Sequence, residues 1–195
     1  AAARELRDEG RARAEAESLL AALIENVPVM LLVKSGTDFR YRQVNRMAEA
    51  FFGIPREEFR GRSDAELFPP DQAADARASD RAVMESGAAM EIPLVTRRTA
   101  GGELRSLKVR KLPLQLRGGG PPDIFCIAED LTEQVRSSNA LRESEQRFRL
   151  FADTLPDQVF IAEPGSGRVH YANPATELIW GIAPEHLCAR PDAMQ

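Results

Sequence analysis

The sequence predicts an α+β fold, in which a five-stranded antiparallel sheet carries helices on one face and is flanked by N-terminal and linker helices. Two observations support this fold class. Two runs with strand spacing precede a block of short helices, and three more strand-like runs follow that block. Long stretches of helical composition lie before and after these elements.

The first elements are a helix and a hairpin. Residues 1–26 are rich in Ala, Arg, Glu and Leu and contain no proline, so we expect a helix that Pro28 ends. The apolar run VMLLV at 29–33 predicts a buried strand. After the turn SGTD, RYRQV at 40–44 predicts its hairpin partner.

Short helices follow, and their ends are marked by residue type. Asn45 suits an N-cap, because its side-chain oxygen can accept a free backbone N–H. Gly53 suits the helix end, where a positive φ is cheap for glycine. Ser63 and Glu66 have the spacing of a capping box. Residues 71–86 form one longer helix.

Strand spacing then returns. Met90, Ile92 and Leu94 alternate with polar or small residues, and Gly101-Gly102 is a hairpin turn signal. RGGGPP at 117–122 predicts a second turn. IFCIA at 124–128 is apolar on both faces, which is typical of a central strand.

The strand between these two turns shows a change of parity. Leu107 and Val109 share one face, whereas Leu112 and Leu114 have the opposite parity. We therefore expect a bulge near Lys111. Pro113 cannot donate a backbone hydrogen bond, so we also expect the pairing of this strand to end there.

A helix and an internal repeat complete the chain. Asp130 and Glu133 have capping-box spacing at the start of a new helix. In that helix three apolar residues are seven apart and predict a short coiled-coil seam; they are Leu141, Phe148 and Leu155. The stretch ANPATELIWGIAPEHLCA at 172–189 then aligns without a gap with VNRMAEAFFGIPREEFRG at 44–61.

The repeat predicts tandem domains joined by helices. The second copy stops after its second short helix and lacks the long helix and the last three strands. We expect four segments: an N-terminal helix at 1–26, a complete domain at 27–133, a helical linker at 134–155 and an incomplete second domain at 156–195.

Composition excludes several classes of partner. The net charge of -4 and the pI of about 5.4 offer no attraction to nucleic acid. Two distant cysteines predict neither a disulfide nor a zinc site and favour a reducing compartment. No apolar run is long enough to span a membrane, and the first residues are too charged for a secretory signal. We therefore expect a cytoplasmic location and a piece of a longer protein.

These stretches together resemble the PAS domain family. The matching segments are VNRMAEAFFGIPREEFRG, DAELFPPDQAADARASDRAVMESG, KLPL and CIAEDLTEQ, in this order, and SSNALRESEQRFRLFADTLPD resembles the helices that join PAS domains in bacterial sensors. The resemblance implies a sensory module of a bacterial signal-transduction protein, such as a two-component system. Its output, a histidine kinase or a cyclic-dinucleotide enzyme, would lie outside this chain.

The resemblance also bears on cofactors. Haem-binding members use an axial histidine near the long helix, and residues 27–133 contain no histidine. Flavin photosensors carry a reactive cysteine where this chain has Asp64. We therefore predict no haem and no flavin–cysteinyl photochemistry, and we predict no metal site.

Five residues are candidate ligand contacts: Arg77, Arg81, Met84, Lys111 and Cys126. Arg77 and Arg81 are four apart on one helical face and could clamp a carboxylate, if that face meets the sheet; the competing interpretation is a solvated face with local ion pairs. Cys126 is either a small buried hydrophobe or a sensing thiol, and Met84 is either core or a soft ligand.

Catalysis is not expected. His170 and His186 have no ligand partners at metal spacing, and the complete domain has no histidine for a Ser-His-Asp site. Gly118 to Gly120 precede two prolines and form a turn rather than a phosphate loop.

Two functions remain open. One is a ligand sensor that relays a change through Asp130, Leu131 and Thr132 into the linker helix. The other is a ligand-free module for dimerisation and coupling, in which the seven-spaced apolar seam pairs two copies of the chain. The expected partners are therefore a second copy, a downstream kinase or cyclase domain and a small-molecule ligand.

Overall fold

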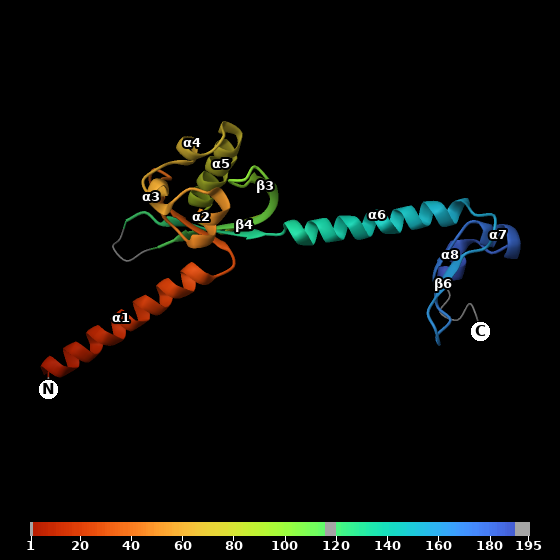
Figure 1. Ribbon diagram of the computed structural model, residues 1–195, viewed down its shortest axis with the longest axis horizontal. Coiled ribbons are helices and arrows are strands. Elements are labelled where there is room, and N and C mark those ends of the chain that lie inside the picture. Colours follow the sequence, from red (N-terminus) through yellow and green to blue (C-terminus); the bar gives the residue numbers. More distant parts are fainter. Residues whose placement is uncertain (1, 116–119, 190–195) are drawn as a thin grey trace. The chain divides into compact units, whose positions relative to one another are not determined.

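The computed structural model describes residues 2–115 and 120–189, with side chains of the first helix described from Gly10 onward (Figure 1). The chain divides into two compact units, Ala1–Glu133 and Gln134–Gln195, and each is described by itself. The turn predicted at 117–122 lies partly outside the described residues.

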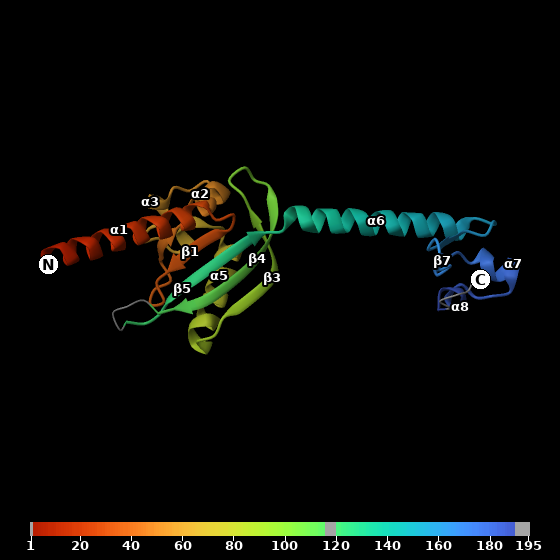
Figure 2. The same ribbon diagram turned by 90° about the horizontal axis from the view of Figure 1, so that it is seen from below.

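Unit 1 contains the predicted sheet. Its helices are α1 (Ala2–Asn26), α2 (Arg46–Phe52), α3 (Arg56–Phe59), α4 (Asp64–Leu67) and α5 (Pro70–Ser86). Its strands are β1 (Met30–Lys34), β2 (Tyr41–Val44), β3 (Met90–Arg98), β4 (Leu104–Leu114) and β5 (Asp123–Asp130). The strands are antiparallel in the order β2-β1-β5-β4-β3. Helices α2 to α5 cover one face, as Figures 1 and 2 show, so the predicted α+β architecture is confirmed.

The helix ends follow the residue types that the sequence places there. Asn45 accepts the N–H of Ala48 at the start of α2, and Gly53 ends α2 with a φ of 65°. Ser63 and Glu66 form the predicted capping box at α4. Each of these local predictions is confirmed, because the capping groups and the backbone that they satisfy lie within a few residues.

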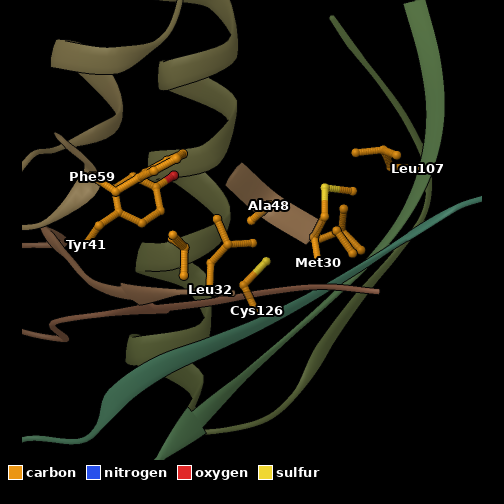
Figure 3. Close-up of a cluster of buried hydrophobic side chains, with 10 residues drawn as sticks. Met30, Leu32, Tyr41, Ala48, Phe59, Leu107 and Cys126 are labelled. Atoms are coloured by element: carbon orange, nitrogen blue, oxygen red, sulfur yellow. The ribbon is translucent and has the colours of Figure 1, made fainter. Parts of the chain in front are cut away.

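Strand β5 is central and supplies the floor of the core. Its inward side chains alternate with half-buried ones: Ile124, Cys126 and Ala128 are buried. Cys126 pairs in register with Leu32 on β1 and with Lys111 on β4. Figure 3 shows Met30, Leu32 and Cys126 on the same face of the strands, with Tyr41 and Phe59 packed beside them.

The bulge predicted near Lys111 is wrong. Strands β4 and β5 pair without a register shift from Leu107 to Leu114, and the pairing continues through Pro113. Leu107, Val109 and Lys111 share the buried face. The lysine is buried because carboxylate and carbonyl oxygens lie above it, so the inward face contains a charge and Leu112 lies on the opposite face.

The irregularity is on β3 instead. The register with β4 shifts between Ile92 and Val95, where β3 carries one residue more than β4. Pro93 lies in this bulge, where its missing N–H removes no ladder bond. Leu94 is consequently exposed, against the predicted alternation, and Val95 takes the inward position.

The described part of unit 2 repeats the beginning of unit 1. Helix α6 (Thr132–Thr154) leads into the hairpin of β6 (Phe160–Ala162) and β7 (Val169–Ala172), followed by α7 (Ala175–Trp180) and α8 (Pro184–Ala189). Gly181 ends α7 with a φ of 67°, as Gly53 ends α2.

One buried asparagine occurs at the same place in both copies. Asn45 Nδ2 donates to the carbonyls of Ile24 and Val29, while its Oδ1 accepts the N–H of Leu31. Asn173 makes the equivalent bonds 128 residues further along, to the carbonyls of Ala152 and Asp157 and the N–H of Val159. Each asparagine side chain therefore joins the end of a leading helix to the start of the first strand of its copy, and that of Asn45 also caps α2.

Candidate functional site

A cavity of about 80 Å³ lies between the sheet and the helices of unit 1. The apolar residues of its wall come from strands β1, β3, β4 and β5 and include two phenylalanine rings from the helical layer. They are Leu32, Phe52, Phe68, Ile92, Val95, Leu107, Val109, Cys126 and Ala128. The other part of the wall is polar: Lys34, Tyr41, Asp64, Gln72, Ser79, Arg97 and Lys111. The cavity therefore presents an apolar side and a charged side to anything that enters it.

Four buried charged residues form a network at the polar side. Lys34 Nζ lies 2.7 Å from Asp64 Oδ2 and 2.8 Å from Asp80 Oδ2. Lys111 Nζ donates to the other oxygen of Asp80, to Ser79 Oγ at 2.7 Å and to the carbonyl of Ala76 at 3.1 Å. Two cations thus balance two carboxylates, and Asp80 joins both lysines.

Lys34 keeps its charge in this network. Burial alone would lower the pKa of Lys34, but the neighbouring carboxylates of Asp80 and Asp64 outweigh it and raise that pKa. A raised pKa means that the stability contributed by this charge is present below the ordinary value of 10.5 and is lost as the pH rises through the folded value. Lys34 is therefore charged at neutral pH.

Tyr41 belongs to the same network. Its hydroxyl donates to Asp64 Oδ1 at 2.8 Å, and the ammonium of Lys34 lies 4.6 Å from the ring centroid. Burial and the adjacent Asp64 carboxylate hold the pKa of Tyr41 well above its usual range. Tyr41 therefore acts as a neutral donor that fixes the orientation of Asp64.

Cys126 lies on the cavity wall between the two lysines of the network. It is buried, and burial raises the pKa of its thiol despite the nearby Lys111 and Lys34. A reactive thiol needs exposure and a lowered pKa. The geometry supports a wall residue rather than a redox sensor.

The long helix α5 turns Asp80, and not its two arginines, toward the sheet. Asp80 is fully buried, whereas Arg77 and Arg81 are exposed and neither lines the cavity. The guanidinium of Arg77 lies over the ring of Phe39, 4.6 Å from its centroid. Met84 packs against Gly36, where an added Cβ would meet its side chain. Of the five candidate contacts, the structure brings Lys111 and Cys126 to the cavity.

Several residues of the cavity wall and of the charge network were not among the five candidates, although the sequence held signals for two of them. Lys34 has the same strand parity as the buried Met30 and Leu32, so alternation alone would have turned it inward. Asp80 follows the buried Ala73 by two turns. A charge on a face that is otherwise apolar is the signal that identifies a buried ion pair.

Arg97 and Gln72 line the cavity from β3 and α5 and are both half-buried. The guanidinium of Arg97 bonds to the carbonyl of its neighbour Thr96 at 3.0 Å. Within residues 2–115 and 120–189 no carboxylate pairs with it, and the side chain of Gln72 has no hydrogen-bond partner there. Arg97 therefore lacks a described carboxylate partner, and Gln72 lacks a described side-chain hydrogen bond.

The predicted relay residues connect the sheet to α6. The N–H of Leu131 and the side chain of Thr132 bond to the backbone of Ser106 on β4, and Asp130 Oδ1 accepts the N–H of Thr132. Burial opposes ionisation of Asp130, but its bonds to Thr132 and Arg105 outweigh this and lower its pKa. These bonds join β4 and β5 to the first turn of α6.

Two of the three residues of the predicted coiled-coil seam lie on α6 with exposed apolar side chains, and the third does not lie on the helix. Leu141 is 61% exposed and Phe148 is 41% exposed, with the Phe148 ring 5.4 Å from that of Tyr171. Leu155 lies immediately after the last residue of α6, Thr154, so it is not on the helix. Two seven-spaced positions remain on one side of α6.

Among the residues that the structure describes, no group of three or more His, Cys, Asp or Glu side chains is placed to hold a metal ion. Nor is any helix in that part of the chain long and apolar enough to cross a membrane.

Five antiparallel strands in this order, with helices over one face and a cavity between the two layers, define an α+β domain of the PAS type. A family model described as "PAS fold" matches residues 24–136, which is more than half of the chain, and the chain belongs to that family. A second model, described as "PAS domain", matches residues 146–193. The resemblance predicted from the sequence is therefore confirmed.

Known proteins agree with this assignment. The protein y4lL of Sinorhizobium fredii is 30% identical over 168 residues, which are 84% of this chain and 20% of that protein, so the chain spans about a fifth of the length of this relative. An RNA-binding light-oxygen-voltage receptor has a similar fold, with a TM-score of 0.55 and 18% identity over 68% of this chain and 38% of the other. VqmA of Vibrio cholerae is similar with a TM-score of 0.52 and 22% identity, over 58% of this chain and 50% of the other.

Proposed function

We propose that unit 1 is the sensory domain of a bacterial signalling protein, that it binds a small molecule in the cavity, and that α6 carries the resulting change to an output domain. The output that we propose is a histidine kinase or a cyclic-dinucleotide enzyme, and the location that we propose is the cytoplasm. The domain itself is proposed to have no catalytic role.

One observation carries the proposal. Strand β5 supplies Cys126 and Ala128 to the cavity wall, and the same strand ends two residues later at Asp130, whose side chain holds the first turn of α6. A ligand that favours one packing of β5 therefore acts on α6 through two residues of continuous backbone. Such a ligand shifts the equilibrium only by its differential affinity for the two packings.

The size and wall of the cavity support our proposal that the domain binds no haem and carries out no flavin–cysteinyl photochemistry. Drug-sized ligands occupy pockets of roughly 300–1,000 Å³, whereas this cavity measures about 80 Å³. A water molecule takes a share of about 30 Å³ in the liquid, so the space suits a short molecule rather than a large planar cofactor. No histidine occurs in residues 27–133, and Asp64 is held by Lys34 and Tyr41.

Thermal unfolding of the full chain against a metabolite library tests ligand binding. We expect a subset of small molecules to raise the midpoint in proportion to concentration, and we expect Ala128→Leu, which fills the cavity, to abolish the shift. Ala74→Leu places the same side chain on the exposed side of α5 and should keep it. No shift with any compound, or equal shifts in Ala128→Leu, would refute cavity binding.

The alternative function is ligand-free dimerisation and coupling, and the exposed apolar side chains of α6 favour it. Leu141 and Phe148, seven residues apart on one side of α6, are 61% and 41% exposed on a helix whose other residues are largely charged or polar. A second copy of the chain would cover such a surface by helix pairing. Sensing and dimerisation are compatible in one protein.

Light scattering measures the mass of the protein in solution and therefore tests dimerisation through α6. We expect Leu141→Glu to shift the chain from dimer toward monomer, because a buried unpaired carboxylate opposes association. Asn139→Glu adds the same charge at an exposed polar position of α6 and should leave the mass unchanged. A Leu141→Glu protein with the mass and concentration dependence of the parent would exclude this seam.

A further inference from the structure

We infer that the cavity recognises a small monoanion with a short apolar body, a carboxylate being the simplest case, and that Arg97 binds its charged group. This inference rests on the proposed function, since it names the class of ligand that the same cavity takes. It depends on the charge balance of the wall, on the bulge in β3 and on the apolar remainder of the cavity.

Of the three cationic side chains that line the cavity, one has no described carboxylate partner. Lys34, Lys111 and Arg97 line the cavity, and the first two are neutralised by Asp64 and Asp80. Lys111 already makes three contacts through its ammonium, which has three protons to donate. Arg97 is the remaining positive charge, and no described carboxylate pairs with it.

The inward position of Arg97 is a product of the bulge. The register shift between Ile92 and Val95 turns Val95 and Arg97 to the cavity side and leaves Leu94 and Thr96 exposed. Bulges commonly re-aim a side chain toward a site. The Arg97 guanidinium bonds to the carbonyl of Thr96 but pairs with no described carboxylate, and its planar fork matches the two-oxygen geometry of a carboxylate.

The other lining residues indicate which further groups the ligand carries. Aliphatic and aromatic side chains, such as Leu32, Phe68 and Val109, also line the cavity. Gln72 is half-buried like Arg97 and offers an amide with no described partner. A ligand with one anionic end beside Arg97, an apolar chain and a polar group within reach of Gln72 uses each of these features.

The probes are straight-chain carboxylates from acetate to octanoate and the primary alcohols of equal chain length, titrated calorimetrically into the full chain. We expect at least one carboxylate to bind, with its alcohol about tenfold or more weaker, because a hydrogen bond between two charged groups is stronger than one to a neutral hydroxyl. Arg97→Gln should weaken the carboxylate by a similar factor, and Arg97→Lys should weaken it less.

The matched control is Arg98→Gln, which removes the same charge one residue along β3, where the side chain is exposed and bonds to the carbonyl of Gly102. It should leave binding unchanged. The Arg97 Nε–H resonance should also shift on titration, and thermal unfolding of each variant without probe verifies its fold.

Each outcome is decisive. Alcohols that bind as tightly as carboxylates, or an Arg97→Gln protein that binds as the parent does, would overturn the anion assignment while leaving a ligand-binding cavity. No binding by any probe also overturns it. The proposed function fails separately, only if the metabolite library and the Ala128→Leu comparison are negative as well.

Discussion

Asp80→Asn is expected to destabilise unit 1 by about 3–5 kcal/mol, the usual cost of removing one partner of a buried ion pair. Asp80 is fully buried and receives both Lys34 and Lys111. Without the Asp80 charge, Lys34 keeps the carboxylate of Asp64, and Lys111 is left as a buried ammonium group with no carboxylate partner. Since domains are stable by only about 5–15 kcal/mol, a large part of the stability would be lost.

The change in the free energy of unfolding is measured by urea denaturation, monitored through the hydrogen exchange of peptides from β1 and β5. Trp180 lies in unit 2, so its fluorescence does not report on unit 1. Asp75→Asn makes the same change at an exposed position of α5 and should cost under about 0.5 kcal/mol.

A second variant separates charge from packing. Removing Lys111 as well, in Asp80→Asn/Lys111→Met, should recover much of the lost stability, because an uncompensated cation is then absent. If Asp80→Asn costs no more than Asp75→Asn, the network is not a determinant of stability.

Asn45→Ala is expected to destabilise unit 1 by about 3 kcal/mol or more, since a lost cap costs about 1 kcal/mol and each buried group left without a partner about 1–3 kcal/mol. Asn45 is 1% exposed, and its amide satisfies the N–H of Leu31 and the carbonyls of Ile24 and Val29. Its loss should also loosen the last turn of α1.

Hydrogen exchange resolves this effect at one amide. The Leu31 N–H donates to the Asn45 side chain, so its exchange should accelerate in Asn45→Ala, while the Val159 N–H, held by Asn173, should not change. Gln43→Ala removes an exposed amide from the neighbouring β2 and should have little effect.

The aspartate variant tests the donor half of the same side chain. Asn45→Asp keeps an acceptor for Leu31 but places carboxylate oxygen against the carbonyls of Ile24 and Val29, so it should be at least as damaging as alanine. Asn45→Asp with parental stability and unchanged Leu31 exchange would show that the bonds to the leading helix contribute nothing.

Local features were predictable because their causes are local. The capping box of Ser63 and Glu66 and the positive φ of Gly53 depend on groups within a few residues. The interior role of Asn45 was only half predicted: its cap is local, whereas its bonds to Ile24 and Val29 span 21 and 16 residues.

The candidate site was predicted less well than the fold. Lys111 and Cys126 were named and line the cavity, whereas Arg77 and Arg81 were named and lie on the exposed side of α5. One residue along a helix turns a side chain by about 100°, so the placement of the helix on the sheet decides which charge is buried. That placement made Asp80 the inward residue.

The sequence by itself determined the order of helices and strands, the repeat and the PAS family, because periodicity and capping are written in neighbouring residues. Only the tertiary structure decided which charges meet. Lys34 is 30 residues from Asp64 and 46 from Asp80, and a bulge of one residue decided whether Leu94 or Arg97 takes part in the cavity. Coulomb attraction between distant residues depends on how the layers pack, and a single extra residue in a strand reverses the face of every residue after it.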